Sequence, residues 1–112
     1  MSAAAVKADQ LDAILAALAD PHRRRVVDLL SRGPQPAGEL ARAVGLTPPA
    51  MSRHLRALKT SGLVEDSHPD FDARVRVYQL KSGSMAELRA WIEETERLWS
   101  DQLVAFKSHL ER

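Results

Sequence analysis

Residues 38–58 read GELARAVGLTPPAMSRHLRAL, and this segment carries the main signal of the fold. Apolar residues at helical spacing come first, and Gly45 then supplies the left-handed residue that commonly follows a helix. Thr47 is a typical helix N-cap, and the proline after it suits the first turn of a second helix. Two helices joined by so tight a turn predict a helix-turn-helix over about residues 37–61.

The flanking segments complete one mainly α domain with a small β-hairpin. Helical spacing of apolar residues predicts three more helices, over about residues 9–19, 22–30 and 83–110. Residues 63–80 contain alternating stretches around turn-forming residues, so they predict the hairpin. The order α-α-α-α-β-β-α is that of a winged helix-turn-helix with a wing at about 63–80. We expect residues 1–8 to be a disordered tail and residues 9–112 to form the domain.

Composition narrows the class of protein. The chain has 112 residues, of which 45% are hydrophobic and 28% are charged, values typical of one soluble globular domain. It contains no cysteine, which excludes disulfides and zinc–thiolate sites. No segment is long and apolar enough to cross a membrane, and the first residues do not resemble a signal peptide. We therefore expect a cytoplasmic protein.

Positive charge is concentrated in one half of the chain and on one helix. Residues 1–62 carry nine basic and five acidic side chains, whereas the C-terminal helix is acidic. At about 100° per residue, the core side of the helix over 47–61 contains a methionine and two leucines. The opposite side and its flanks carry polar and basic residues: Pro49, Ser52, Arg53, His54, Arg56, Lys59 and Thr60.

This helix has no carboxylate from Thr47 to Ser61. A helix that is merely solvated usually mixes charges, because pairs of opposite sign four residues apart stabilise it. Arginine can bind guanine with two hydrogen bonds in the major groove of DNA, and the groove admits one helix. The pattern predicts a DNA recognition helix. The alternative is a winged-helix module that binds protein and does not read DNA.

Three segments resemble the ArsR/SmtB family of bacterial winged-helix repressors: ALADPHRRRVVDLL (17–30), GELARAVGLTPPAMSRHLRALKTSGLV (38–64) and RVRVYQL (74–80). The resemblance covers about residues 11–110 and is greatest to members without a metal motif. It implies a homodimer that binds a palindromic operator and represses transcription. Carried over by position, it implies base contacts from Ser52 and Arg53 and phosphate contacts from Thr47, His54 and Arg56.

The resemblance also implies that Arg74 and Arg76 of the wing approach the minor groove. The wing sequence departs from the family pattern because it is acidic, with Glu65, Asp66, Asp70 and Asp72. Carboxylates repel phosphate, so we expect no deep wing contact. The two arginines, expected on the solvent face of the second strand, can instead be neutralised by these carboxylates.

The terminal helices carry more apolar surface than one small domain can bury. We predict that this surface forms a homodimer interface, as the family resemblance also implies. The alternative is that all of it packs on the core of a single chain. The interface residues that we expect are Leu11, Ile14, Leu18, Trp91, Leu98, Trp99 and Phe106.

We expect no metal site, cofactor or enzymatic activity. Asp101 and His109 are the candidate ligands of the last helix, but they are about 12 Å apart along its axis. The acidic residues of the wing, with His68, are expected to form a solvated loop. Ser52 and His54 point about 200° apart on one helix, which does not suit a nucleophile and its base. The inducer, if one exists, is unknown from the sequence.

Overall fold

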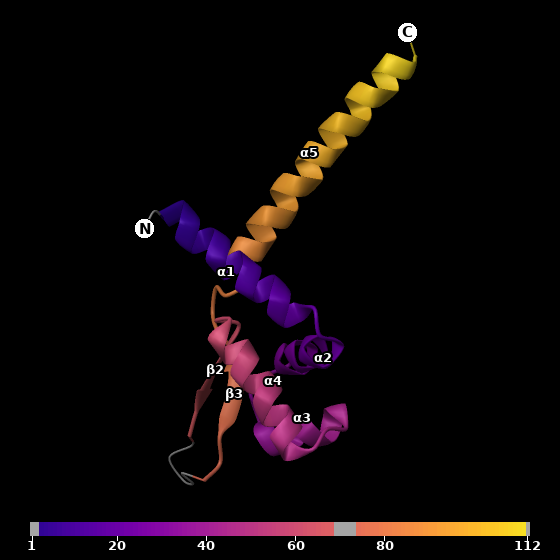
Figure 1. The fold of residues 1–112 in the computed structure, drawn as a ribbon. Coiled ribbons are helices and arrows are strands. Elements are labelled where there is room, and N and C mark those ends of the chain that lie inside the picture. Colours follow the sequence, from indigo (N-terminus) through magenta and orange to yellow (C-terminus); the bar gives the residue numbers. More distant parts are fainter. Residues whose placement is uncertain (1–2, 69–73, 112) are drawn as a thin grey trace.

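The computed structural model describes residues 3–68 and 74–111, which form five helices and three short strands (Figure 1). This architecture confirms the predicted winged helix-turn-helix, with one strand more than expected. In chain order the elements are α1 (Ala3–Leu18), α2 (Pro21–Leu30), β1 (Gln35–Pro36), α3 (Ala37–Val44), α4 (Pro48–Thr60), β2 (Val64–Ser67), β3 (Val77–Leu80) and α5 (Ala86–Leu110).

The turn between α3 and α4 has the predicted geometry. Gly45 ends α3 with a φ of 79°, a left-handed conformation that favours glycine, and its N–H donates to the carbonyl of Ala41 at 2.9 Å. The hydroxyl of Thr47 accepts a hydrogen bond from the N–H of Ala50 at 3.3 Å. This bond satisfies one of the free amides at the start of α4 and fixes where the helix begins.

The wing is part of a three-stranded antiparallel sheet in the order β1-β3-β2. Strand β1 was not predicted. Its Gln35 pairs with Tyr78, and the N–H of Ala37 donates to the carbonyl of Arg76 at 3.2 Å, which joins the start of α3 to the wing. Strand β3 begins at Val77, later than the predicted start at residue 74. The predicted turn at residues 69–73 lies outside the described residues.

Helix α1 begins at Ala3, so residues 3–8 of the expected disordered tail are helical. The sequence from Ala3 to Ala8 is rich in alanine, the residue with the highest helix propensity, and it has no glycine or proline to stop the helix. The apolar spacing that marked the predicted start near residue 9 shows where the helix contacts the core. It does not show where the helix begins.

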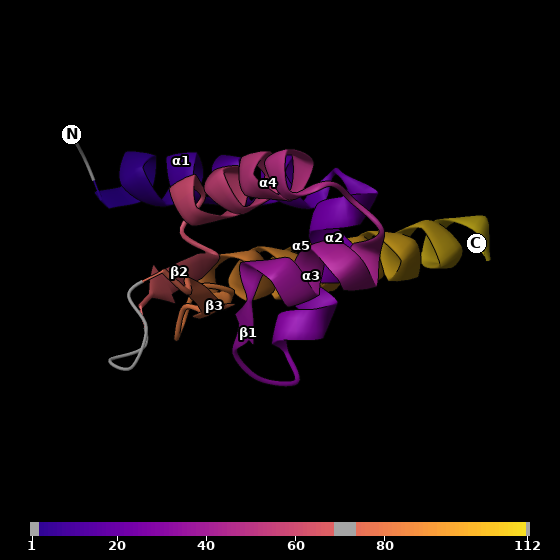
Figure 2. The ribbon, with the colours of Figure 1, turned by 90° about the horizontal axis from the view of Figure 1, so that it is seen from below.

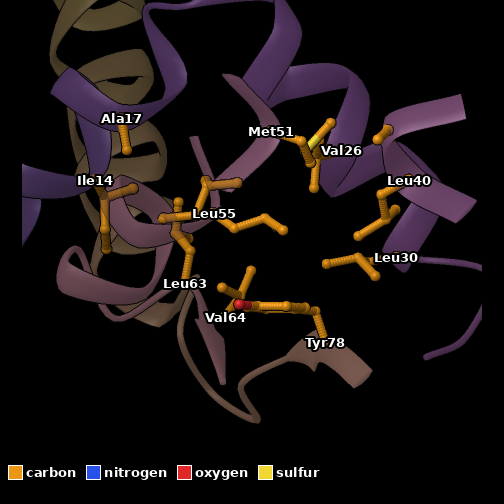
Figure 3. Close-up of a cluster of buried hydrophobic side chains, with 12 residues drawn as sticks. Ile14, Ala17, Val26, Leu30, Leu40, Met51, Leu55, Leu63, Val64 and Tyr78 are labelled. Atoms are coloured by element: carbon orange, nitrogen blue, oxygen red, sulfur yellow. The ribbon is translucent and has the colours of Figure 1, made fainter. Parts of the chain in front are cut away.

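The core lies between α1, α2, α3, α4 and the sheet (Figure 3). Complete burial of a leucine or valine side chain contributes about 1.5–3 kcal/mol, so this cluster is the main source of stability. Figure 2 shows α1 and α4 running side by side, and the two helices are in contact. The buried residues are Ile14, Ala17, Val26, Leu30, Leu40, Ala41, Met51, Leu55, Leu58, Leu63, Val64 and Tyr78.

Helix α5 projects from this body (Figure 1). It contacts α1 near its own N-terminal end, and none of its residues is buried. Large apolar side chains along the projecting part are therefore exposed in the single chain, among them Trp99 with 64% of its surface accessible. A soluble monomer rarely exposes so long an apolar stripe.

Candidate nucleic-acid interface

Helix α4 has one apolar side and one polar side. Met51, Leu55 and Leu58 are buried in the core, so the rotation of the helix turns the residues between them outward. The exposed side includes most of the residues that were predicted to contact DNA from this helix, namely Thr47, Pro49, Ser52, Arg53, Arg56 and Lys59. The structure therefore places these side chains together on one accessible surface, which we call the α4 face.

Two arginines on the α4 face carry uncompensated charge. Arg53 and Arg56 are exposed, and no carboxylate in the described residues, 3–68 and 74–111, forms an ion pair with either of them. Elsewhere on the surface, Arg42, Arg89 and Arg97 each pair with a carboxylate of their own helix. The two α4 guanidiniums are thus available to an anionic partner.

His54 differs from the other predicted DNA contacts because it is half-buried against α2. Arg23 donates from Nε to His54 Nδ1 at 3.2 Å, and the His22 and His54 rings lie 5.5 Å apart with a tilt of 48°. Arg23 thereby adds a third guanidinium beside the α4 face. This position was not predicted from the sequence, because Arg23 and His54 are 31 residues apart and no local pattern connects them.

The N-terminus of α2 is capped by Asp20. Its Oδ1 accepts hydrogen bonds from the N–H groups of His22 at 2.8 Å and Arg23 at 3.3 Å. Partial burial raises the pKa of this carboxyl, but the hydrogen bonds from the two amides, together with the charge of Arg23, outweigh burial, so the pKa is lowered. Because Asp20 occupies these amides, this helix end does not offer them to a phosphate.

An acidic residue of the wing, Asp66, forms ion pairs with two basic residues that were predicted to contact DNA. Asp66 lies 2.7 Å from Lys59 Nζ and 3.2 Å from Arg76 Nε, and only 10% of its side chain is exposed. The hydrogen bond from Lys59 lowers the pKa of Asp66, as do the charges of Lys59 and Arg76, although partial burial raises it. From the sequence, Asp66 was expected to lie in a solvated loop. It instead connects α4 to the sheet.

The expected neutralisation of Arg76 by a wing carboxylate is present, and the same carboxylate neutralises Lys59. Arg74 and Arg76 are exposed, but both precede β3, so the prediction that they lie on the face of that strand was wrong. Asp70 and Asp72 lie outside the described residues. The positive surface of the domain is consequently centred on α4, with the wing charge partly cancelled.

The predicted dimer residues divide into two groups. Ile14 is 3% exposed in the single chain, so it belongs to the core and the prediction that it contacts a partner was wrong. Leu11 and Leu18 are half-buried, and the neighbouring Leu15 is more exposed than either. The predicted residues of α5 are all exposed in the single chain: Trp91, Leu98, Trp99 and Phe106.

Within the described part of the chain, no group of three or more histidine, aspartate and glutamate side chains is arranged to hold a metal ion. Asp101, one of the two candidate ligands on the last helix, accepts a hydrogen bond from Arg97 at 3.3 Å. Residues 3–68 and 74–111 also contain no helix with the length and apolar character that a membrane span needs.

Comparison with known proteins gives a consistent result. A family model described as a helix-turn-helix domain matches residues 18–66. The HTH-type transcriptional regulator Rv2034 of Mycobacterium tuberculosis is 41% identical over 90 residues, which cover 80% of this chain and 78% of that protein.

Two solved structures share most of the fold. The ArsR family transcriptional regulator RHA00566 is 35% identical, with a TM-score of 0.73 over 82% of this chain and 92% of that chain. The homodimeric winged helix-turn-helix DNA-binding domain Mb0332 of Mycobacterium bovis is 27% identical, with a TM-score of 0.68 over 91% and 93% of the two chains. Sequence identity, fold and the exposed basic helix agree, and the chain belongs to the ArsR/SmtB family of winged helix-turn-helix transcriptional regulators.

Proposed function

We propose that this regulator is a homodimeric repressor that binds an inverted-repeat operator with α4 in the major groove. The observation that carries the proposal is the α4 face, where Arg53 and Arg56 project without a carboxylate partner in the described residues. Ser52 and Arg53 are the base-reading residues in this proposal, and Thr47, His54 and Arg56 bind phosphates. Lys59, Pro49 and the wing arginines flank this contact.

The dimer follows from the exposed stripe on α5. Trp91, Leu98, Trp99 and Phe106 are separated mainly by seven or eight residues, about two helical turns, so they lie on one side of the helix. A second copy of the chain would cover this stripe with its own α1 and α5. Two-fold symmetry would then set the two α4 helices about 34 Å apart, one turn of DNA.

Repression follows physically from occupancy, because a dimer that covers an operator inside a promoter excludes RNA polymerase from the same DNA. Binding to chromosomal DNA would place the protein in the cytoplasm. Neither the α4 face nor the α5 stripe requires a cofactor or a metal in this proposal. The wing would contribute little charge, since Asp66 holds both Lys59 and Arg76.

The test is selection of binding sites from the organism's own sheared DNA, followed by sequencing of the retained fragments. We expect enrichment of a short inverted repeat. The variant Arg53→Ala should bind that repeat about 1–3 kcal/mol more weakly and lose preference at one position of each half-site. Arg89→Ala on α5, which removes an exposed arginine far along the chain, is the matched control and should bind normally.

The neutralised wing is the feature that favours the second candidate, a winged-helix module that binds protein and does not read DNA. The same selection separates the two functions. Retention of no DNA in moderate salt, with a dimer still present by light scattering, would contradict the repressor proposal and favour the module. Salt-sensitive retention without an enriched sequence would show a basic surface that lacks base readout.

A further inference from the structure

We propose that a groove between α1 and α4 binds a small aromatic carboxylate, and that this ligand competes with DNA for Arg53 and Arg56. The inference rests on the proposed DNA-binding function and adds a way to regulate it. The groove has a volume of about 400 Å³ and lies where the two helices run side by side (Figure 2). This volume falls within the range of about 300–1,000 Å³ that is usual for small-molecule sites.

The floor of the groove is apolar because its residues are small. Ala13, Ala16 and Ala17 line it from α1, and Ala57 lines it from α4. Ala13 and Ala16 remain exposed although they face a neighbouring helix, so among residues 3–68 and 74–111 no side chain fully covers them. An aromatic ring placed there would remove apolar surface from water, at about 25 cal/mol per Å².

The rim of the groove is positive. Arg23, Arg53 and Arg56 all line it, and none of the acidic residues that the structure describes does. Arg23 uses Nε for His54, and in the described part of the chain no carboxylate pairs with any of the three side chains. A guanidinium binds a carboxylate through two parallel hydrogen bonds and also stacks on aromatic rings. The charge of the rim and the apolar floor together select an aromatic carboxylate.

Dimer formation leaves this groove open. On α1, Leu11, Leu15 and Leu18 lie on the opposite side of the helix from Ala13 and Ala16, at about 100° per residue. A partner chain that covers the leucine side does not reach the alanine side. The proposed ligand can therefore bind the same dimeric protein that binds DNA.

The position of the rim determines what the ligand does. Arg53 and Arg56 belong both to the groove and to the α4 face, so a carboxylate held by them occupies the donors that DNA needs. Binding of the ligand and of the operator then oppose each other. Each weakens the affinity of the other by the same factor, because coupling between two binding equilibria is reciprocal.

The test uses the full chain with methyl-labelled alanine and 2-naphthoate as the probe. We expect 2-naphthoate to shift the methyl resonances of Ala13, Ala16 and Ala57. The neutral isostere 2-naphthamide should bind about tenfold more weakly, since it lacks the charge that Arg53 and Arg56 recognise. Acetate, which has the charge without the ring, should cause no shifts at the same concentration.

Two variants test the location. Ala16→Leu places a larger side chain in the groove and should weaken 2-naphthoate about tenfold while it leaves DNA binding intact. Ala13→Leu is a second variant of the same kind, in case the first does not fold. Ala43→Leu, an exposed helical alanine of α3 outside the groove, is the matched control and should bind the probe normally.

The inference is overturned if 2-naphthoate shifts none of the three methyl groups, if 2-naphthamide binds equally well, or if both groove variants bind the probe like the original chain. Competition is read by adding 2-naphthoate to the complex with retained genomic DNA, and an unchanged complex would overturn the regulatory step. Failure of the chain to bind DNA without any probe is a different result. It contradicts the proposed function and is measured separately.

Discussion

The ammonium group of Lys59 lies 2.7 Å from Asp66 Oδ1, so this ion pair joins the C-terminal end of α4 to β2, the first strand of the wing. The other carboxylate oxygen of Asp66 lies 3.2 Å from Arg76 Nε. One nearly covered carboxylate thus neutralises two cations that face the proposed DNA surface. Its removal would increase the positive charge of this surface without changing α4 itself.

Asp66→Asn should therefore bind non-operator DNA more tightly and with greater sensitivity to salt. If Lys59 and Arg76 both reach phosphates once released, the slope of log affinity against log salt should steepen by about 1–2 units. Fluorescence anisotropy with a random duplex over a range of sodium chloride measures this slope. Glu93→Gln, which removes an exposed carboxylate paired with Arg89, is the control, and an equal slope in both variants would contradict the prediction.

Trp99→Ala should weaken the dimer. The indole is 64% exposed in the single chain and belongs to the stripe that the partner would cover, so its loss should increase the fraction of monomer in sedimentation velocity at micromolar protein. Val104→Ala is the matched control, because Val104 is equally exposed but lies on the other side of α5. A dimer that withstands Trp99→Ala, or that is weakened as much by Val104→Ala, would exclude the proposed interface.

Gly45→Ala should destabilise the chain by about 1–2 kcal/mol, because a residue with a Cβ is strained at the positive φ of this turn. A Cβ at this position would meet no other atom, so the cost comes from the backbone alone. Gly38→Ala is the paired control. Gly38 lies within α3 and does not have a positive φ, and alanine there should be neutral or stabilise by about 0.5–1 kcal/mol. Urea denaturation of both variants measures the difference.

Asp20→Ala should cost about 1 kcal/mol at neutral pH, because it removes the N-cap of α2. The pKa of Asp20 is lowered from its ordinary value of 3.8, so the stability it provides is present above that pH. It is lost as the pH falls through the lower, folded-state pKa. The difference in unfolding free energy between the original chain and Asp20→Ala should thus shrink below pH 3.8, and a difference that stays constant down to low pH would contradict this prediction.

Features that depend on a few neighbouring residues were predictable from the sequence. Gly45 and Thr47 each act within four residues of their own position, so the turn and the start of α4 could be placed from local chemistry. The outward side of α4 followed from its periodicity, because burial of Met51 and its apolar neighbours leaves only one orientation. Strand β1 was not predicted because it contains only Gln35 and Pro36, and two residues are too few to show an alternation of polar and apolar side chains.

Contacts between elements that are distant in the chain could not be predicted from the sequence. The apolar residues of α1 show that one side of the helix must be covered, but they do not distinguish the core from a partner, and Ile14 was therefore misassigned. Arg23 reaches His54 only because α2 crosses α4, which no pattern in either helix indicates. Asp66 was read as a loop residue, since its two cationic neighbours come from different elements.

The projecting part of α5 links gene control to protein abundance. Its apolar side chains are exposed in the single chain, so in the proposed function the form that binds DNA is built from two molecules. While most of the protein is monomeric, the concentration of that form rises with the square of the amount synthesised. A twofold change in synthesis then changes promoter occupancy by up to about fourfold, by mass action. In the proposed function, the exposed apolar side of α5 thus makes promoter occupancy depend steeply on the concentration of the protein.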